Sequence, residues 1–326
     1  MNQLYPLKFK PVFKDKIWGG HQIRTKLGMD FGALPNCGEA WLISGYGDDL
    51  TVVENGFLAG NNVNELVEVY MGELVGDRIF EKYGNEFPLL IKFIDSNDWL
   101  SVQVHPDDEL SKKMQINGGK TEMWYVLGAE KGAELISGFS KKVSKEEYLE
   151  KLNSKNLKEI LNYEKVEGGD VFFIPAGRVH ALGPGILLAE IQQTSDATFR
   201  IYDWDRIDTA GMARELHTEA ALQALDFEVQ QEYKTKYEPL QNQTTSLVDC
   251  PYFTTRLIDM DKDVVKNFQE LDSFVIYLVV EGSCSLSSTA GKLDLKLGEA
   301  VLVPASIDNI GLHPHQKTKL LEIFIA

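Results

Sequence analysis

The sequence predicts a mainly β protein with two antiparallel sandwich or barrel domains and a few helices inserted in or flanking the first domain. Short runs rich in Val, Ile, Phe, Tyr and Leu alternate with Gly, Pro, Asn and Asp residues, as strands alternate with turns. The length of 326 residues favours two domains, because a single core stops growing near roughly 250–300 residues. Since residues 227–246 are polar and Gln-rich, we interpret them as a linker and divide the chain into residues 1–236 and 237–326.

The expected strands form one set on each side of this linker. Before it, strands are predicted at residues 39–44, 89–95, 100–105, 123–127, 170–174 and 187–192. After it, they are predicted at residues 253–259, 274–280, 291–297, 300–304 and 320–325.

Helical periodicity appears in three places, all before the linker. Apolar residues spaced three or four positions apart predict helices at about residues 62–84, 144–163 and 213–226. Ser144 followed by Glu147 forms a capping-box pattern at the start of the second helix. We interpret this helix as an insertion in the first domain.

A short pattern in the first domain recurs in the second. A Gly followed by an acidic residue, an apolar run and Pro-Ala appears at residues 169–176 and again at residues 298–305. Both copies therefore predict a tight turn, a buried strand and a second turn in the same order. The first copy leads to His180, whereas the equivalent position in the second is Asn309. We therefore expect a degenerate second domain that lacks metal ligands.

Composition and charge exclude several classes of protein. The chain is 44% hydrophobic and 25% charged, which is typical of a folded globular protein. Its net charge of −16 argues against nucleic acid or an anionic membrane as a partner. The three cysteines form no CxxC pair, and the N-terminus has no signal-peptide pattern, so we expect a cytoplasmic protein. The oligomeric state is left open between a monomer and a small homo-oligomer.

Polar residues alternate with apolar ones in two of the expected strands. Ser101, Gln103 and His105 share one face of the first strand. Lys120 and Glu122 share one face of the second. A polar face in the middle of a core strand needs a partner, and we expect that partner to be another polar group or a ligand.

Four residues form a candidate metal-binding set: Gln103, His105, Glu122 and His180. Two imidazoles, one carboxylate and one amide oxygen suit Zn²⁺ with positions left open, whereas Ca²⁺ or Mg²⁺ prefers oxygen ligands alone. Either histidine by itself is better explained as an ordinary polar residue near the core. The four together, on strands expected to face one another, favour a metal site.

At this point the sequence resembles the type I mannose-6-phosphate isomerases, in their short bacterial form. The resemblance rests on QVHPDD at residues 103–108, GKTEMWYVL at 119–127 and PxGxxH at 175–180, with further motifs at 10–20, 38–44, 88–95 and 192–206. It implies a double cupin fold, two jelly-roll domains, of which only the first carries metal. It also implies interconversion of mannose 6-phosphate and fructose 6-phosphate, a phosphorylated hexose pair, by proton transfer through a 1,2-enediolate.

The resemblance assigns roles to individual residues. The four residues of the metal-binding set are implied to hold one Zn²⁺ per chain, and Arg200 is implied to be catalytic. The implied pocket residues are Lys92, Ser101, Lys120 and Asp196. Lys92 lies within an apolar run, where a buried ammonium needs an anion, either a substrate phosphate or a neighbouring carboxylate. It can equally be explained as an edge-strand lysine that discourages aggregation.

Other functions fit parts of the same pattern. Another cupin sugar isomerase or a metal-dependent dioxygenase would use a similar ligand set. A non-catalytic bicupin that binds or senses sugars would explain the degenerate second domain. The general base of an isomerase is not assigned, because Glu122, His180, a water or a lysine of the pocket could each move the proton.

Overall fold

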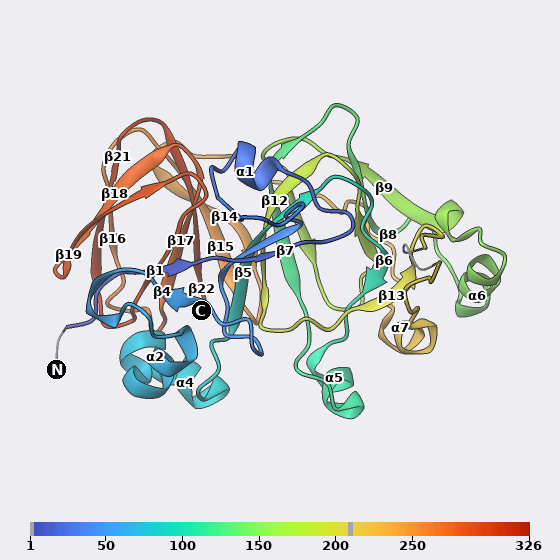
Figure 1. The fold of residues 1–326 in the computed structure, drawn as a ribbon, viewed down its shortest axis with the longest axis horizontal. Helices are drawn as coiled ribbons and strands as arrows, with labels where there is room; N and C mark the ends of the chain where they lie inside the picture. Colours follow the sequence, from blue (N-terminus) through green and yellow to red (C-terminus); the bar gives the residue numbers. More distant parts are fainter. Residues whose placement is uncertain (1–2, 208–210) are drawn as a thin grey trace.

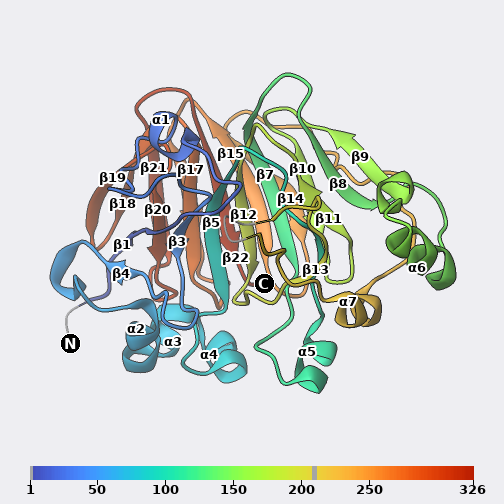
Figure 2. The same cartoon turned by 45° about the vertical axis from the view of Figure 1, so that its right-hand side comes forward.

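The computed structural model describes residues 3–207 and 211–326, and it is mainly β, as the sequence predicts. Figure 1 shows two barrels side by side, one drawn mostly in green and yellow and the other mostly in orange and red. In Figures 1 and 2 the helices lie at the periphery of these barrels. Within the described ranges, no helix is both long enough and apolar enough to cross a bilayer.

The first barrel consists of a six-stranded and a five-stranded sheet. In pairing order, the larger sheet contains β10 (Val171–Ile174), β7 (Glu122–Ala129), β12 (Ile186–Gln193), β5 (Leu89–Ser96), β3 (Glu39–Ile43) and β2 (Val12–Lys14). The smaller contains β13 (Phe199–Tyr202), β6 (Val102–Val104), β11 (His180–Leu182), β8 (Glu134–Phe139) and β9 (Leu161–Lys165).

The second barrel consists of a seven-stranded and a four-stranded sheet. The larger contains β14 (Gln243–Asp249), β15 (Thr254–Met260), β22 (Thr318–Phe324), β17 (Val275–Glu281), β20 (Ala300–Val303), β1 (Leu7–Lys10) and β4 (Val52–Val53). The smaller contains β16 (Val264–Asn267), β21 (Asn309–Pro314), β18 (Ser283–Ser288) and β19 (Gly291–Lys296).

The strand nearest the N-terminus, β1, belongs to the sheet of the second barrel. Leu7 of β1 pairs with Leu302 of β20, and Phe9 pairs with Val53 of β4. The seven-stranded sheet thus combines strands from both ends of the chain. The division of the chain at residue 236 remains a prediction, and this sheet contains strands from both sides of it.

The predicted helices are present but shorter than expected. Residues 62–84 form α2 (Val63–Tyr70), α3 (Gly72–Val75) and α4 (Asp77–Tyr83), separated by Met71 and Gly76, which have φ values of 47° and 99°. The second predicted helix is α6 (Lys145–Asn153), capped by Ser144 and followed by η2 (Leu157–Ile160) and β9. The third, α7 (Thr218–Ala224), begins five residues later than predicted. The elements α1 (Gln22–Thr25), η1 (Gly56–Leu58) and α5 (Asp108–Met114) were not predicted.

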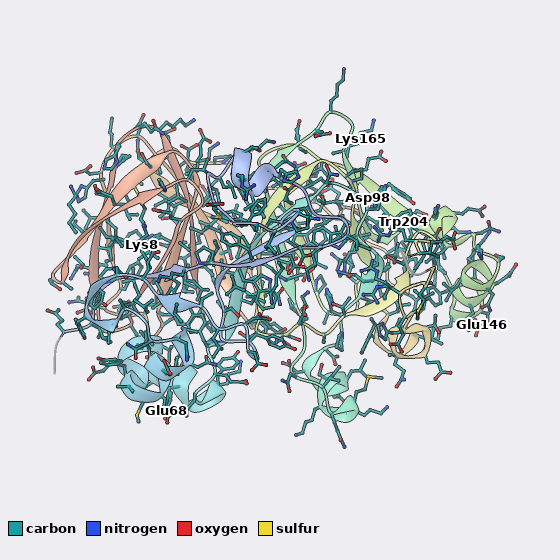
Figure 3. All side chains as sticks on the ribbon, viewed as in Figure 1. Lys8, Glu68, Asp98, Glu146, Lys165 and Trp204 are labelled. Carbon is teal, nitrogen blue, oxygen red and sulfur yellow. The ribbon has the colours of Figure 1, made fainter. Side chains whose placement is uncertain are left out.

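The strands of the six-stranded sheet separate an apolar face from a face that mixes apolar residues with buried polar ones. On β7, Met123 and Tyr125 pack in a hydrophobic core that also contains Ile276 and Leu278 of the second barrel. Trp124 points the other way, into the first barrel, as strand alternation requires. The two large sheets therefore share one core. Charged residues such as Glu68, Glu146 and Lys165 lie at the outer surface (Figure 3).

The internal repeat corresponds to equivalent strands with different inward-facing residues. His180 begins β11 and Asn309 begins β21, as the repeat predicts. However, the side chain of Asn309 is exposed, and the next residue, Ile310, is buried in the core of the second barrel. The residue that faces inward at this level is therefore apolar in the second barrel.

Candidate metal centre and active site

Three strands of the first barrel bring two histidines and a glutamate together. His105 directly follows β6, Glu122 begins β7 and His180 begins β11. Nε2 of His105 lies 3.5 Å from one carboxylate oxygen of Glu122, and Nε2 of His180 lies 3.4 Å from the other. One potential ligand atom from each residue lies within 4.8 Å of the other two. The side chains are each about 1% exposed, so the cluster is closed to bulk water.

Backbone carbonyl groups orient both imidazoles. Nδ1 of His105 is 2.7 Å from the carbonyl oxygen of Ala197, and Nδ1 of His180 is 2.9 Å from that of Arg178. A carbonyl oxygen only accepts, so each Nδ1 carries the proton and each Nε2 presents a lone pair to the cluster. Burial lowers the pKa of His180 to about 4 and that of His105 well below its usual value. Both rings are therefore neutral at pH 7, the form that binds metals.

The polar atoms of the cluster fit a cation. Both carboxylate oxygens of Glu122 and Nε2 of His105 are buried without a hydrogen-bond partner among the described residues. Burial and then the charge of Glu190 raise the pKa of Glu122 to about 8, although Lys120 and Lys92 act in the opposite direction. Buried acceptors that lack donors are costly unless a cation satisfies them. The three residues could therefore hold a metal ion.

Gln103 lies beside this cluster as the sequence predicts. Its backbone pairs with that of His180 between β6 and β11. Its Nε2 is 3.2 Å from Nε2 of His180, and its Oε1 accepts a 3.4 Å hydrogen bond from Ser101. The structure thus brings all four members of the predicted metal-binding set to one place.

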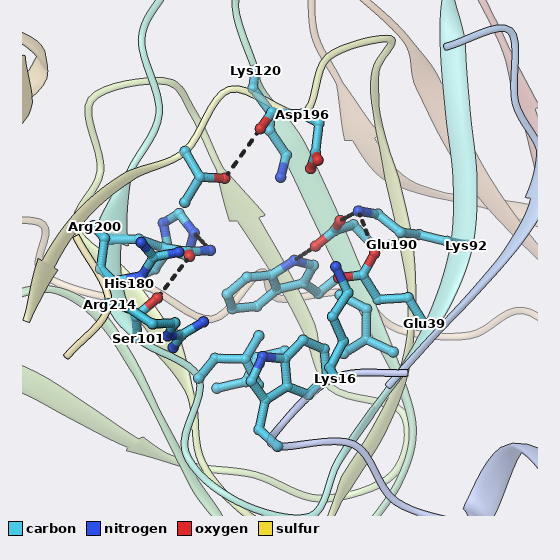
Figure 4. A pocket seen from close by; sticks show the side chains of 17 residues that line it. Lys16, Glu39, Lys92, Ser101, Lys120, His180, Glu190, Asp196, Arg200 and Arg214 are labelled. Carbon is cyan, nitrogen blue, oxygen red and sulfur yellow. Dashed lines mark hydrogen bonds and ion pairs between the residues drawn. The ribbon is translucent and has the colours of Figure 1, made fainter. Parts of the chain in front are cut away.

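A cavity of about 290 Å³ lies next to the cluster, inside the first barrel. Seven of the predicted site residues line it: Lys92, Ser101, Gln103, Lys120, His180, Asp196 and Arg200. The remaining lining residues are Lys16, Trp18, Glu39, Ile94, Leu100, Trp124, Leu182, Glu190, Thr198 and Arg214. Figure 4 shows Arg200, Arg214 and Ser101 on one side of this cavity and Lys92, Glu190 and Glu39 on the other.

Lys92 is neutralised by two carboxylates of the protein. Its Nζ lies 3.0 Å from Glu190 and 3.7 Å from Glu39. Trp124 and Trp41 each donate a 2.7 Å hydrogen bond to one of these acids. Burial alone would raise the pKa of Glu39, but Lys92 and then Lys16 lower it to about 2. The anion that Lys92 requires is therefore present without a substrate. The edge-strand explanation is wrong, since β5 lies between β12 and β3.

Arg200 differs from the other cations that line the cavity. Its Nη1 donates to the carbonyl oxygen of Glu215 at 2.8 Å, and its Nε is buried with no partner among the described residues. Burial and then the nearby charge of Arg214 lower the pKa of Arg200. It forms no ion pair within residues 3–207 and 211–326, so its charge is available to an anion.

The sequence reasoning missed several residues of the cavity. Glu190 was detectable, because it is an acidic residue inside the apolar run that predicts β12. Glu39 and Lys16 had no local pattern that distinguished them. The helix predicted at residues 213–226 includes Arg214, but in the structure Arg214 lies in an irregular segment that precedes α7.

Comparisons with known proteins match both halves of the chain. Residues 6–136 match the type I phosphomannose isomerase catalytic domain, and residues 243–318 match the mannose-6-phosphate isomerase cupin domain, which confirms the predicted double cupin fold. Mannose-6-phosphate isomerase ManA of Bacillus subtilis is 36% identical over 94% of this chain and 95% of that protein. The Streptococcus mutans mannose-6-phosphate isomerase is 35% identical over 93% of each.

Solved structures show the same architecture. The crystal structure of mannose 6-phosphate isomerase from Bacillus subtilis matches with a TM-score of 0.87 and 33% identity, over 98% of this chain and 99% of that chain. A mutant of phosphomannose isomerase from Salmonella typhimurium matches with a TM-score of 0.77 over 98% and 100% of the two chains. At 16% identity, this second match is a likeness of fold.

Proposed function

The chain belongs to the type I phosphomannose isomerase family, and from this premise we propose that it interconverts D-mannose 6-phosphate and D-fructose 6-phosphate. The proposal is supported most strongly by one observation: the buried His105–Glu122–His180 cluster adjoins a cavity lined by five cationic side chains. A metal-binding cluster beside a basic cavity suits a phosphorylated sugar, even though the protein as a whole carries a net charge of −16.

We propose that Gln103, His105, Glu122 and His180 together hold one Zn²⁺. Neutral imidazoles, a carboxylate and an amide oxygen are suitable zinc ligands, and the carbonyl groups that bind Nδ1 of each histidine are typical second partners of ligating histidines. These residues would hold the ion, which would supply Lewis-acid chemistry at the carbonyl group of the sugar.

Arg200 would supply the fixed positive charge that the reaction requires. The isomerisation moves a proton between C2 and C1 of the sugar, and a hydroxyl proton moves in the same direction between O2 and O1, so no oxidant or reductant is consumed. The intermediate is a 1,2-enediolate, and a preorganised cation at its developing oxyanion is usually the largest contribution to catalysis. The guanidinium of Arg200, which forms no ion pair among the described residues, is suited to this role, and Ser101 and Lys120 would hydrogen-bond to the sugar.

An aldose–ketose assay on the purified protein, with and without chelator, tests these proposals. We expect turnover of mannose 6-phosphate that is lost on chelation and restored by Zn²⁺, with Ca²⁺ as the control that does not restore it. Full activity after complete metal removal would contradict the metal role. Absence of turnover in the zinc-loaded protein would contradict the choice of substrate.

We also propose that the protein acts in the cytoplasm. All three cysteines are free thiols, which suits a reducing compartment. Fractionation of the native cells, with the protein detected by antibody, checks this, and recovery with exported proteins would contradict it.

A further inference from the structure

Charge is distributed unevenly around the cavity. On one side, Lys16 and Lys92 are balanced by Glu39 and Glu190, which lie within 3.0–3.7 Å of them. Lys120 lies 3.4 Å from Glu122. These cations are therefore already paired and leave little net charge for a substrate phosphate.

The opposite side of the cavity is lined by Arg200 and Arg214, and the carboxylate that pairs with Arg214 is shared with a third arginine. Arg214 donates from Nε to Asp203 at 2.7 Å, and its Nη2 donates to the second oxygen of the same carboxylate. Arg206 also binds Asp203, at 2.6 Å, so a single carboxylate is shared by two guanidinium groups. Asp98 approaches Arg206 at 3.5 Å, but its side chain is 56% exposed and solvent screens the pair.

Arg214 is held in a fixed orientation toward the cavity. The bidentate bond to Asp203 uses the edge of the guanidinium that contains Nε, so the edge that carries Nη1 faces away from Asp203. Arg214 and Arg200 line the same cavity, and Figure 4 shows them on the same side. The two guanidinium groups repel each other and the nearby Asp203 offsets this repulsion only in part, so both groups would stabilise an anion bound in the cavity.

We propose that Arg214 is a substrate-binding residue that anchors the phosphate group of the sugar. The phosphate would therefore lie on the side of the cavity that carries Arg200, and not on the side that carries Lys92. Planar guanidinium groups bind phosphate oxygens in a bidentate manner, and Asp203 preorganises Arg214 for this contact. The inference rests on the proposed function, because it names where that substrate's anionic end is held.

The test compares three forms of the zinc-loaded protein: wild type, Arg214→Gln and Arg206→Gln. Arg206 is the matched control, because it shares Asp203 but does not line the cavity. Binding of fructose 6-phosphate, inorganic phosphate and unphosphorylated fructose is measured by calorimetric titration, and KM and kcat are measured separately. The Arg214→Lys variant shows how far a point charge restores the contact.

For Arg214→Gln we expect dissociation constants for fructose 6-phosphate and phosphate that rise by about tenfold or more. KM should rise while kcat changes by less than about threefold, and fructose binding should not change. Unchanged phosphate binding, or an equal loss in Arg206→Gln, would overturn the proposal. If wild type binds phosphate through Arg214 but turns over no sugar phosphate, the proposed function fails while this site stands.

Discussion

At the scale of single residues, Lys92 shows how a charge is accommodated in a nearly solvent-free position. Its side chain is 3% exposed, and its carboxylate partners come from β3 and β12, the two strands that flank β5. From the sequence one can infer that this lysine requires an anion. The identity of the anion could not be inferred, because Glu39 and Glu190 approach it only through long-range strand pairing.

We expect Lys92→Met to destabilise the protein by about 3–5 kcal/mol, because it leaves two buried carboxylates without their cation. Urea unfolding followed by circular dichroism measures the change. Lys16→Met is the matched control: it contacts the same Glu39, but its side chain is 33% exposed, and it should cost roughly 1 kcal/mol or less. Equal losses in the two variants would show that burial of the pair is unimportant.

We expect Arg200→Ala to fold normally and to lose turnover by on the order of 10²–10³-fold, the usual effect of removing one oxyanion-stabilising group. The resemblance to the family identified this residue, and the structure adds that its Nε has no partner within the described ranges. Steady-state assays measure the loss, with Arg78→Ala, whose side chain is 64% exposed, as the control. A wild-type kcat in Arg200→Ala would contradict the proposal that Arg200 stabilises the enediolate.

At the scale of elements, local pattern located the predicted strands but missed others, such as β8, β13 and β18, and it was insufficient for helix limits. The alternation of apolar and polar residues on β6 and β7 predicted the inward-facing side chains, because strand geometry has a period of two. The late start of α7 depends on a distant contact: the backbone N–H of His217 binds the carbonyl oxygen of Arg200 at 2.7 Å, which ties the preceding segment to β13. This hydrogen bond joins residues that are far apart in the sequence, so local periodicity could not predict it.

The membership of β1 in the second barrel leads to a prediction about fragments. A fragment of residues 237–326 should fail to fold stably, because it lacks β1 and leaves the apolar edge of β20 unpaired. The fragment would also expose the apolar residues that pack against Met123 and Tyr125 of β7 in the full chain. The dispersion of amide signals in an NMR spectrum checks this, with the full chain as the reference. A well-dispersed spectrum of the fragment would show that the second barrel is autonomous.

At the scale of the whole molecule, the second barrel repeats part of the charge arrangement of the first. Glu322 of β22 pairs in register with Arg256 and Tyr277, just as Glu190 pairs in register with Lys92 and Trp124. Tyr277 donates a 2.9 Å hydrogen bond to Glu322, in the manner of Trp124 and Glu190. The repeat in the sequence predicted the duplication of strands. The repeat could not show that the contacts of Glu190 have counterparts at Glu322, because the contacting residues are spaced differently along the chain in the two halves.

The carboxylates that form ion pairs predict an acid limit to the stability of the whole protein. The pKa of Glu39 is about 2, below its usual value near 4.3, so its stabilisation is complete above about pH 5 and declines as the pH falls toward 2. Asp203 also has a lowered pKa, which Arg214 and Arg206 maintain against burial. We therefore expect the free energy of unfolding to fall below pH 5, although acid also reduces the net charge of −16.

Urea unfolding at pH 7 and pH 3 measures this effect, and Glu39→Gln is the informative variant. The difference in the free energy of unfolding between wild type and Glu39→Gln should be smaller at pH 3 than at pH 7. Acid protonates Glu39 and weakens its ion pairs, whereas glutamine has no ionisable group at this position. Glu68→Gln, which alters an exposed side chain, serves as the control. A difference that stays constant with pH would contradict the assigned charge state of Glu39.

The placement of β1 also constrains how the protein is made. Leu7 is synthesised well before its partner Leu302, which lies almost 300 residues later in the chain. At an elongation rate of about 5–20 residues per second, β1 lacks its partner strand β20 for on the order of 15–60 s. During that time its hydrogen-bonding edge is open to other nascent chains. Translation speed and the availability of chaperones should therefore influence the yield of native protein more than the modest length of the chain suggests.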